Sequence, residues 1–410
     1  MTFISQTSNA TAINDVWTIT IGGTWVAGDK ITTTGNGKSL VTTIGSVVTV
    51  AGVAITLSQS FNSTNFTDTT ATQSPAIGGT SIPEFREGST YYTATTVVIV
   101  GNTAGNKLCT FTVTKTSASG TVSISNTTAA TGPSDWTNTA NWSTGTVPVT
   151  GDDVLLDRPI SMLDNLAQSA VTLASLTYGP RFTLPAVVGR PSRNPNGYEE
   201  FRSTELAIGV TNLTVNCGSG LIRMNLGSVA CTATVYASGA STDAGRQAIQ
   251  LRGTNAANSL NITGPTTLNS TAYVSWAESG DTATLATLRQ DTGTMVIGQP
   301  GVGTVTLTTV TKNGGELYLC CGATTVTNSG NLYHYAGAIT TATHYANTWT
   351  DLTTATYTTM TTHGVYNADG AVGAKTITNL NLVSPGSVVN TSGRLTVTNL
   401  TTLRGTLSIA

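Results

Sequence analysis

The sequence predicts a mainly β protein in which a small N-terminal α+β domain is followed by a parallel β-solenoid, or β-helix. The first observation is composition: 9% of the residues are charged and 39% are hydrophobic, whereas typical globular proteins have about 25% charged residues. Thr, Ser, Asn and Gly replace the missing charge, which suits strands separated by turns. The second observation is a loose repeat in the C-terminal half, where short Thr/Leu/Val strings alternate with strings that begin with Gly or Asn.

Residues 1–130 form the predicted N-terminal domain. The segment from Thr24 to Ile44 alternates apolar and polar residues and turns at Asn36-Gly37, which is a hairpin signal. The following segment resembles a strand in composition, but its apolar residues recur at steps of three and four residues. This spacing predicts a helix over about residues 46–62 with Ser46 as its N-cap. Strand patterns return over residues 91–103 and 107–117.

Residues 131–162 are predicted to be a joint that also caps the solenoid. The stretch TGPSDWTNTANWSTGTVPVTGDDVLLD concentrates Trp, Pro and Asp in a chain that is otherwise poor in all three. Its aspartates lack the alternate spacing of an EF-hand loop, so we expect no metal site, although a structural cation remains an alternative. We expect the tryptophans to plug the apolar end of the solenoid and the other residues to shape the joint and its turn: Trp136, Asn141, Trp142, Pro148, Gly151 and Asp152.

Residues 163–410 are predicted to be the solenoid. The Gly-led strings at residues 293, 315, 330, 386 and 405 are about 15 to 22 residues apart where the series is unbroken. This period fits one solenoid rung and is too short for a propeller blade. In a parallel ladder, stacked Thr and Asn hydrogen-bond and stacked Val, Leu and Ile fill the core. A β-sandwich array is the rival fold.

A loop at residues 181–206 interrupts the early rungs and is unusually rich in charge. Its prolines and its Asn-Pro-Asn-Gly turn are incompatible with a regular rung. The loop is either a solvated surface segment or an inter-subunit clasp of arginine–carboxylate pairs. The residues of this predicted clasp are Arg181, Arg190, Arg193, Glu199, Glu200, Arg202 and Glu205.

The sequence contains no recognisable catalytic, cofactor-binding or metal-ligating motif. His334, His344 and His363 lack metal-ligand spacing and are expected to be surface residues beside tyrosines. Trp276 and Trp349 are either core residues or sugar-stacking platforms. Glycosidic cleavage needs two carboxylates about 5–10 Å apart, and nothing marks such a pair among the candidates Glu278, Asp281, Asp291, Glu316, Asp351 and Asp369. We therefore expect a protein that is not an enzyme and has no cofactor.

Charge and cysteine content exclude several classes of function. The net charge is −2 without a basic run, so there is no electrostatic basis for nucleic-acid binding. No apolar run reaches the roughly 20 residues of a membrane span. The N-terminus has no recognisable secretory signal, which favours virus parts released by lysis over exported adhesins. The five cysteines, an odd number without a CxxC motif, are expected to be reduced, packed thiols.

Two groups of motifs resemble proteins of tailed-phage and prophage virions. The pattern from Trp136 through Asn141-Trp142-Ser143 and Val147-Pro148 to Gly151-Asp152-Asp153 resembles a joint at the start of β-solenoids in bacterial surface proteins and virion proteins. GTWVAGDKITTT, the predicted helix, IPEF and GNTAGNKLCTFTVT resemble a small domain that precedes this joint in phage structural proteins. The likeness covers most of residues 15–180. It implies a head fibre, a capsid decoration or a tail fibre.

The expected function is therefore that of a structural protein of a tailed-phage virion. The N-terminal module would bind other virion proteins of the capsid or tail, and the solenoid would project outward as a homotrimer that serves attachment, with host surface glycan as a possible partner. The expected location is the virion, assembled in the host cytoplasm. Two alternatives are an exported bacterial adhesin, expected to carry an export signal and a C-terminal anchor, and a glycan depolymerase on a solenoid scaffold.

Overall fold

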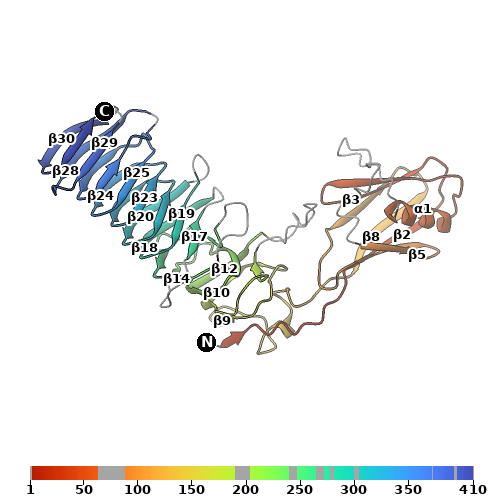
Figure 1. Ribbon diagram of the computed structural model, residues 1–410. Coiled ribbons are helices and arrows are strands. Elements are labelled where there is room, and N and C mark those ends of the chain that lie inside the picture. Colours follow the sequence, from red (N-terminus) through yellow and green to blue (C-terminus); the bar gives the residue numbers. More distant parts are fainter. Residues whose placement is uncertain are drawn as a thin grey trace.

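The chain is mainly β and consists of a long parallel solenoid and a small N-terminal α+β module, as the sequence predicts (Figure 1). Figure 1 shows the solenoid as a rod of stacked strands, with the N-terminus beside its first strands and the C-terminus at its far end. The computed structural model describes residues 2–62, 88–189, 204–239, 247–264, 272–277, 281–299, 304–371, 373–391 and 395–409.

The N-terminal module contains two antiparallel sheets and one α-helix around their own apolar core. The four-stranded sheet has the order β5 (Gly88–Tyr92), β6 (Thr96–Gly101), β2 (Val16–Gly23) and β8 (Gly120–Thr128). The three-stranded sheet has the order β4 (Lys38–Thr43), β3 (Lys30–Gly35) and β7 (Phe111–Lys115). The predicted hairpin is the β3–β4 pair, and Asn36 and Gly37 form its turn with positive φ values of 51° and 75°.

The helix α1 (Val50–Asn62) begins four residues later than the sequence predicts. Thr49 caps it in place of Ser46: its side-chain oxygen accepts a hydrogen bond from the Gly52 N–H at 3.1 Å, and its carbonyl accepts from Val53. Val47, before this cap, is exposed, whereas the residues with helical spacing are buried in the core of the module. The apolar period therefore identified the helix correctly, and its start depends on the cap.

The solenoid is built from two parallel ladders that alternate along the chain, which we call sheet one and sheet two. Both have continuous pairing from one rung to the next, with neighbouring strands about 4.8 Å apart. Sheet one contains β1 (Phe3–Ser5), β9 (Asp153–Leu156), β10 (Ala167–Tyr178), β12 (Leu206–Asn216), β14 (Thr232–Ala237), β16 (Ser259–Ile262), β18 (Thr282–Gln290), β20 (Thr304–Lys312), β22 (Ala323–Asn328), β24 (Ile339–His344), β26 (Tyr357–Thr362), β28 (Lys375–Leu382) and β30 (Leu395–Leu403). Sheet two contains β11 (Val187–Val188), β13 (Leu221–Asn225), β15 (Ile249–Arg252), β17 (Tyr273–Trp276), β19 (Thr294–Ile297), β21 (Glu316–Leu319), β23 (Asn331–His334), β25 (Thr348–Asp351), β27 (Val365–Asn367), β29 (Val388–Thr391) and β31 (Thr406–Ile409).

The rung length is short and nearly regular in the C-terminal half of the rod. From β18 onward, the paired inward residues of sheet one lie 22, 16, 16, 18, 20 and 20 residues apart, in the predicted range. These paired residues are Leu288, Val310, Val326, Ala342, Met360, Leu380 and Leu400. Earlier in the rod some paired residues lie further apart in the sequence, for example Leu176 and Leu213, which are 37 residues apart.

The first residues of the chain belong to the rod, which corrects the predicted start of the N-terminal domain at residue 1. Strand β1 pairs in parallel with β9, so that Ile4 lies opposite Val154 and joins the solenoid core. The chain then crosses into the module and returns through the joint. The N-terminal segment and the joint are therefore held together at the beginning of the rod.

Candidate functional site

The joint residues singled out in the sequence lie at the start of the rod. Trp136 and Trp142 are buried and belong to the solenoid core, with their rings 4.9 Å apart in an edge-to-face arrangement. The Trp142 Nε1–H donates to the Trp136 carbonyl at 2.8 Å. Asn141 is fully buried and donates to the carbonyls of Gly132 and Asp135, both at 2.8 Å. These contacts give the joint a structural role.

The remaining joint residues shape the turn that enters β9. Pro148 is buried, and Gly151 has a φ of +92°, a conformation that favours glycine. The Asp152 carboxylate accepts a hydrogen bond from the Val149 N–H at 2.9 Å and so closes the turn. Among the described residues, no group of three or more His, Cys, Asp or Glu side chains is arranged to hold a metal ion.

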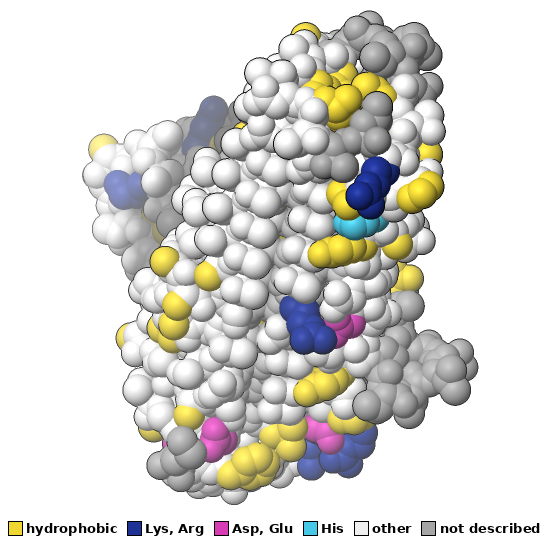
Figure 2. All heavy atoms as spheres, turned by 90° about the vertical axis from the view of Figure 1, so that its left-hand side faces the viewer, with side chains coloured by type: hydrophobic (Ala, Val, Ile, Leu, Met, Phe, Trp, Pro, Cys, Tyr) yellow, Lys and Arg dark blue, Asp and Glu magenta, His cyan; other side chains and the backbone are white. Residues whose placement is uncertain are grey.

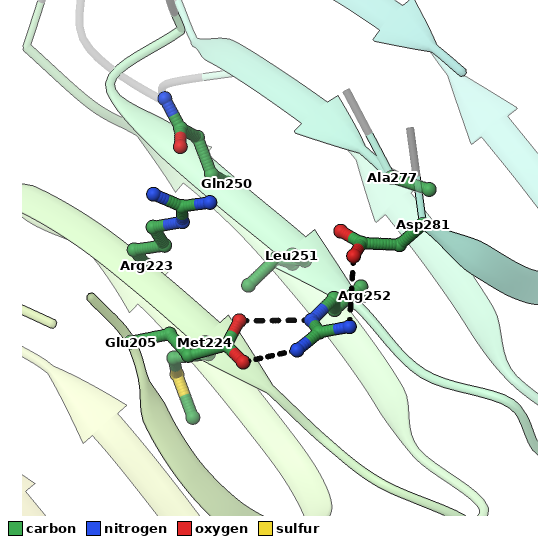
Figure 3. A pocket seen from close by; sticks show the side chains of 8 residues that line it. All are labelled: Glu205, Arg223, Met224, Gln250, Leu251, Arg252, Ala277 and Asp281. Atoms are coloured by element: carbon green, nitrogen blue, oxygen red, sulfur yellow. Dashed lines mark hydrogen bonds and ion pairs between the residues drawn. The ribbon is translucent and has the colours of Figure 1, made fainter. Parts of the chain in front are cut away.

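The most promising polar site is a shallow, open hollow on the early rungs of the rod (Figure 3). Its polar lining comes from four strands of the two ladders: Glu205 directly precedes β12, Arg223 lies on β13, Gln250 and Arg252 lie on β15, and Asp281 directly precedes β18. The parallel ladder brings these residues together although up to 76 residues of chain separate them.

Arg252 bridges the two carboxylates of the hollow. Its guanidinium forms a two-pronged ion pair with Glu205, one contact of which is Nε–Oε2 at 2.8 Å, and its Nη1 contacts Asp281 Oδ1 at 2.9 Å. Figure 3 shows the guanidinium between the two acids. The hydrogen bond to Glu205, together with the charges of both acids, raises the pKa of Arg252 above its usual value. The side chain of Arg223 makes no ion pair or hydrogen bond within the described part of the chain.

The predicted inter-subunit clasp is only partly visible. Arg190, Arg193, Glu199, Glu200 and Arg202 lie outside the described residues. Arg181 and Glu205 are described, and both are paired within the chain: Arg181 with Asp157 at 2.8 Å and Glu205 with Arg252. These two residues are therefore already neutralised without a second subunit, which differs from the role that the sequence suggested for them.

Two histidines and two tryptophans of the repeat region lie inside the rod, although the histidines were predicted to be at the surface. His334 and His344 are completely buried, so the prediction of surface histidines is wrong for both. They alternate with inward-facing apolar residues and are therefore part of the core. Trp276 and Trp349 are also completely buried, which rules out a sugar-stacking role for either ring.

Several buried polar side chains form a column at one corner of the rod. Each lies at the inward-facing end of a strand of sheet one and donates to a carbonyl of the turn that follows. The contacts are Gln290 to Gly293 (3.1 Å), Lys312 to Gly315 (2.7 Å), Asn328 to Gly330 (2.9 Å) and Thr362 to Gly364 (3.1 Å), and the ring nitrogen Nε2 of His344 lies 3.1 Å from the Asn347 carbonyl. Burial lowers the pKa of Lys312 to about 8, against a smaller opposing effect of Glu316, and burial likewise lowers the pKa of His344.

A second buried group surrounds Asp351 in the C-terminal rungs. The Asp351 Oδ2 atom lies 2.8 Å from the Lys375 ammonium and accepts hydrogen bonds from the hydroxyls of Tyr357 and Tyr366. Lys375 also donates to two carbonyls, and His334 Nδ1 lies 2.6 Å from the Tyr357 hydroxyl. All five residues are at most 1% exposed. This group satisfies its own charges inside the rod and is closed to a ligand.

This buried group was not predicted from the sequence as a unit. Asp351 appeared only among the candidate carboxylates, and Lys375 was not considered. The signal was the alternation of β25: since Trp349 faces inward, Asp351 two residues later must also face inward. A charged residue at an inward position needs a buried counterion, and Lys375 provides it.

None of the five cysteines is in a disulfide bond, and four of them are buried. No helix in the described ranges has the length and apolar character of a membrane span. Neither the models of known protein families, nor curated proteins, nor solved structures gave a match to this chain. The function is therefore argued from the geometry and from the motifs of the chain itself.

Proposed function

We propose that the protein is a structural component of a tailed-phage virion, a fibre or decoration whose N-terminal module binds the capsid or tail and whose rod projects outward for attachment. The observation that carries this proposal is the division of the chain into a compact module and a long rod, joined by a tightly hydrogen-bonded, Trp-containing joint. A stiff joint suits a part that must hold a rod away from a surface. The resemblance of the joint to those of virion proteins points in the same direction.

A homotrimer is the proposed assembly state, because fibrous virion proteins commonly use threefold symmetry. Light scattering of the full chain after size exclusion measures the mass directly. Three times the 42.0 kDa chain mass is expected. A monomer at micromolar concentration would refute this part of the proposal.

The location is tested with particles rather than with isolated protein. Phage particles from a culture that carries this sequence should contain the protein after density-gradient purification, as detected by mass spectrometry of the particle band. Recovery in the envelope fraction of uninfected cells, with none in particles, would instead support the exported adhesin. Binding of the labelled full chain to host cells, and its loss after removal of surface glycan, tests the attachment role and its proposed partner.

A glycan depolymerase is a second candidate, because the hollow places two carboxylates, Glu205 and Asp281, on one surface. Arg252 lies between them and contacts both, so neither acid is free to act opposite the other across a sugar. We therefore favour binding over cleavage. Incubating the full chain with host capsule or lipopolysaccharide and measuring new reducing ends decides between the two. Reducing ends that disappear in Glu205→Gln would establish the enzyme.

A further inference from the structure

One face of the rod carries a regular array of threonines. Four consecutive strands of sheet one, β20, β22, β24 and β26, each present a Thr-x-Thr unit whose middle residue is completely buried. Since neighbouring side chains of a strand alternate, both threonines of each unit face outward. The parallel register places the units directly above one another: Thr309 and Thr311, Thr325 and Thr327, Thr341 and Thr343, Thr359 and Thr361.

The array continues sideways and has no charge. Each unit is preceded by one more exposed threonine, which widens the face by a further column: Thr308, Thr324, Thr340 and Thr358. The outward positions of these four strands contain no charged residue. Figure 2 shows one face of the molecule, most of which consists of uncharged polar side chains and backbone, with a few charged groups and several small apolar patches.

Ladder stability does not explain the threonines. Sheet two has the same parallel register in the same rungs, but its outward positions are mixed: Glu316, Tyr318, Asn331, Tyr333, Thr348, Thr350, Val365 and Asn367. There, Tyr318 and Tyr333 stack with ring centroids 5.0 Å apart. Because either kind of side chain is compatible with the ladder, the repetition of threonine on sheet one needs a different explanation.

The hydroxyls of the array are available to water. Of the eight Thr-x-Thr hydroxyls, only that of Thr361 has a partner in the described part of the chain, the Asn381 amide at 3.1 Å. The spacing of the array is about 4.8 Å between rungs and about 6.6 Å between the two threonines of a strand. Threonine is stiff at χ1, so the hydroxyls and methyls are held at fixed positions. The spacing between rungs is close to the shorter repeat of the water oxygens on the prism faces of hexagonal ice, and the spacing along a strand is somewhat shorter than the longer repeat.

We infer that this threonine face of sheet one binds ice. Water bound along the hydroxyl columns repeats with the period of the ladder and merges with the surface of a growing crystal, while the methyl groups fill the spaces between. Other partners fit the face less well. It has no aromatic or arginine anchor for a protein, no ring platform for a sugar and no cation for a nucleic acid. The inference goes beyond the proposed virion role and does not depend on it.

The test uses the full chain and two lysine variants in the same rung. Thr325→Lys places a charge in the centre of the array on β22, whereas Asn331→Lys places the same charge on β23, at an exposed position of sheet two. The enrichment of each protein in slowly growing ice is measured against its concentration in the remaining liquid. Thermal unfolding of both variants establishes that each is folded.

We expect the wild-type chain and Asn331→Lys to be enriched in ice, and Thr325→Lys to lose at least about tenfold of that enrichment, equivalent to about 1.4 kcal/mol of binding free energy. Exclusion of the wild-type chain from ice, or an equal loss in both variants, would overturn the inference. Sedimentation of the wild-type chain with cellulose or chitin, without ice enrichment, would assign the face to a crystalline glycan and would also overturn it.

Discussion

Removing the buried negative charge of Asp351 should strongly destabilise the C-terminal rungs. In Asp351→Asn the side chain keeps its shape, but the Lys375 ammonium, 1% exposed and 2.8 Å from the carboxylate, loses its counterion. Leaving one member of a buried pair without its partner costs about 3–5 kcal/mol. The hydroxyls of Tyr357 and Tyr366 also lose their charged acceptor. We therefore expect a loss at the upper end of that range.

The same group gives the protein a defined response to acid. Burial alone would raise the pKa of Asp351, but the neighbouring His334 and Lys375 side chains together lower it to about 2. The folded-state pKa lies below the unfolded value, so this contribution is complete above about pH 4 and is lost as the pH falls towards about 2. The difference corresponds to about 2–3 kcal/mol, and the Asn variant should lack this part of the pH dependence.

Urea denaturation of the full chain between pH 2 and pH 7 measures both effects, with hydrogen exchange in β25 to β28 locating the loss. Asp369→Asn is the matched control because Asp369 is exposed and lies in the next rung, and it should change the free energy of unfolding by less than about 0.5 kcal/mol. Combining Asp351→Asn with Lys375→Met should restore part of the stability, since the unpaired charge is then gone. A loss below about 1 kcal/mol in Asp351→Asn would refute the reasoning.

Three further changes test other parts of the molecule. Trp142→Ala should lower the free energy of unfolding by about 3–5 kcal/mol, because the ring is buried against Trp136; an unchanged melting temperature would mean that the ring does not support the end of the rod. Since the pKa of Lys312 falls to about 8 in the folded state, the wild-type chain should gain about 2–3 kcal/mol between pH 8 and pH 10.5. Lys312→Met should lack this gain. If urea denaturation gave the two proteins the same pH dependence of the free energy of unfolding, the prediction would be wrong. Thr49→Ala should cost about 1 kcal/mol through loss of the helix cap, measured by thermal unfolding, whereas Ser46→Ala should cost little.

The fold class and the rung length could be predicted because both depend on local repetition. Inward positions such as Val310 and Val326 recur with the strand period, and a parallel ladder converts that recurrence into stacking. The helix could be recognised from its apolar spacing, but its first residue could not, because Ser46 and Thr49 are both acceptable caps and only packing decides between them.

The sites were harder to predict because they depend on which distant residues the ladder places together. Glu205, Arg252 and Asp281 are far apart in the sequence, and their contact follows from a register that includes long connections of unequal length. His334 and His344 were misplaced because a polar side chain was assumed to face water. Each has partners inside the rod, the Tyr357 hydroxyl for one and the carbonyls of Asn347 and Val365 for the other, which compensate its burial.

Because each rung is one complete repeat of the ladder, the rod can be lengthened or shortened only by whole rungs. Val310, Val326 and Ala342 are stacked and are 16 residues apart. Excising residues 326–341 would join Thr325 to Ala342, keep inward and outward positions unchanged, and shorten the rod by about 4.8 Å. A gene encoding such a rod can thus lengthen or shorten its product by duplicating or deleting one rung, so that reach evolves separately from the module at its base.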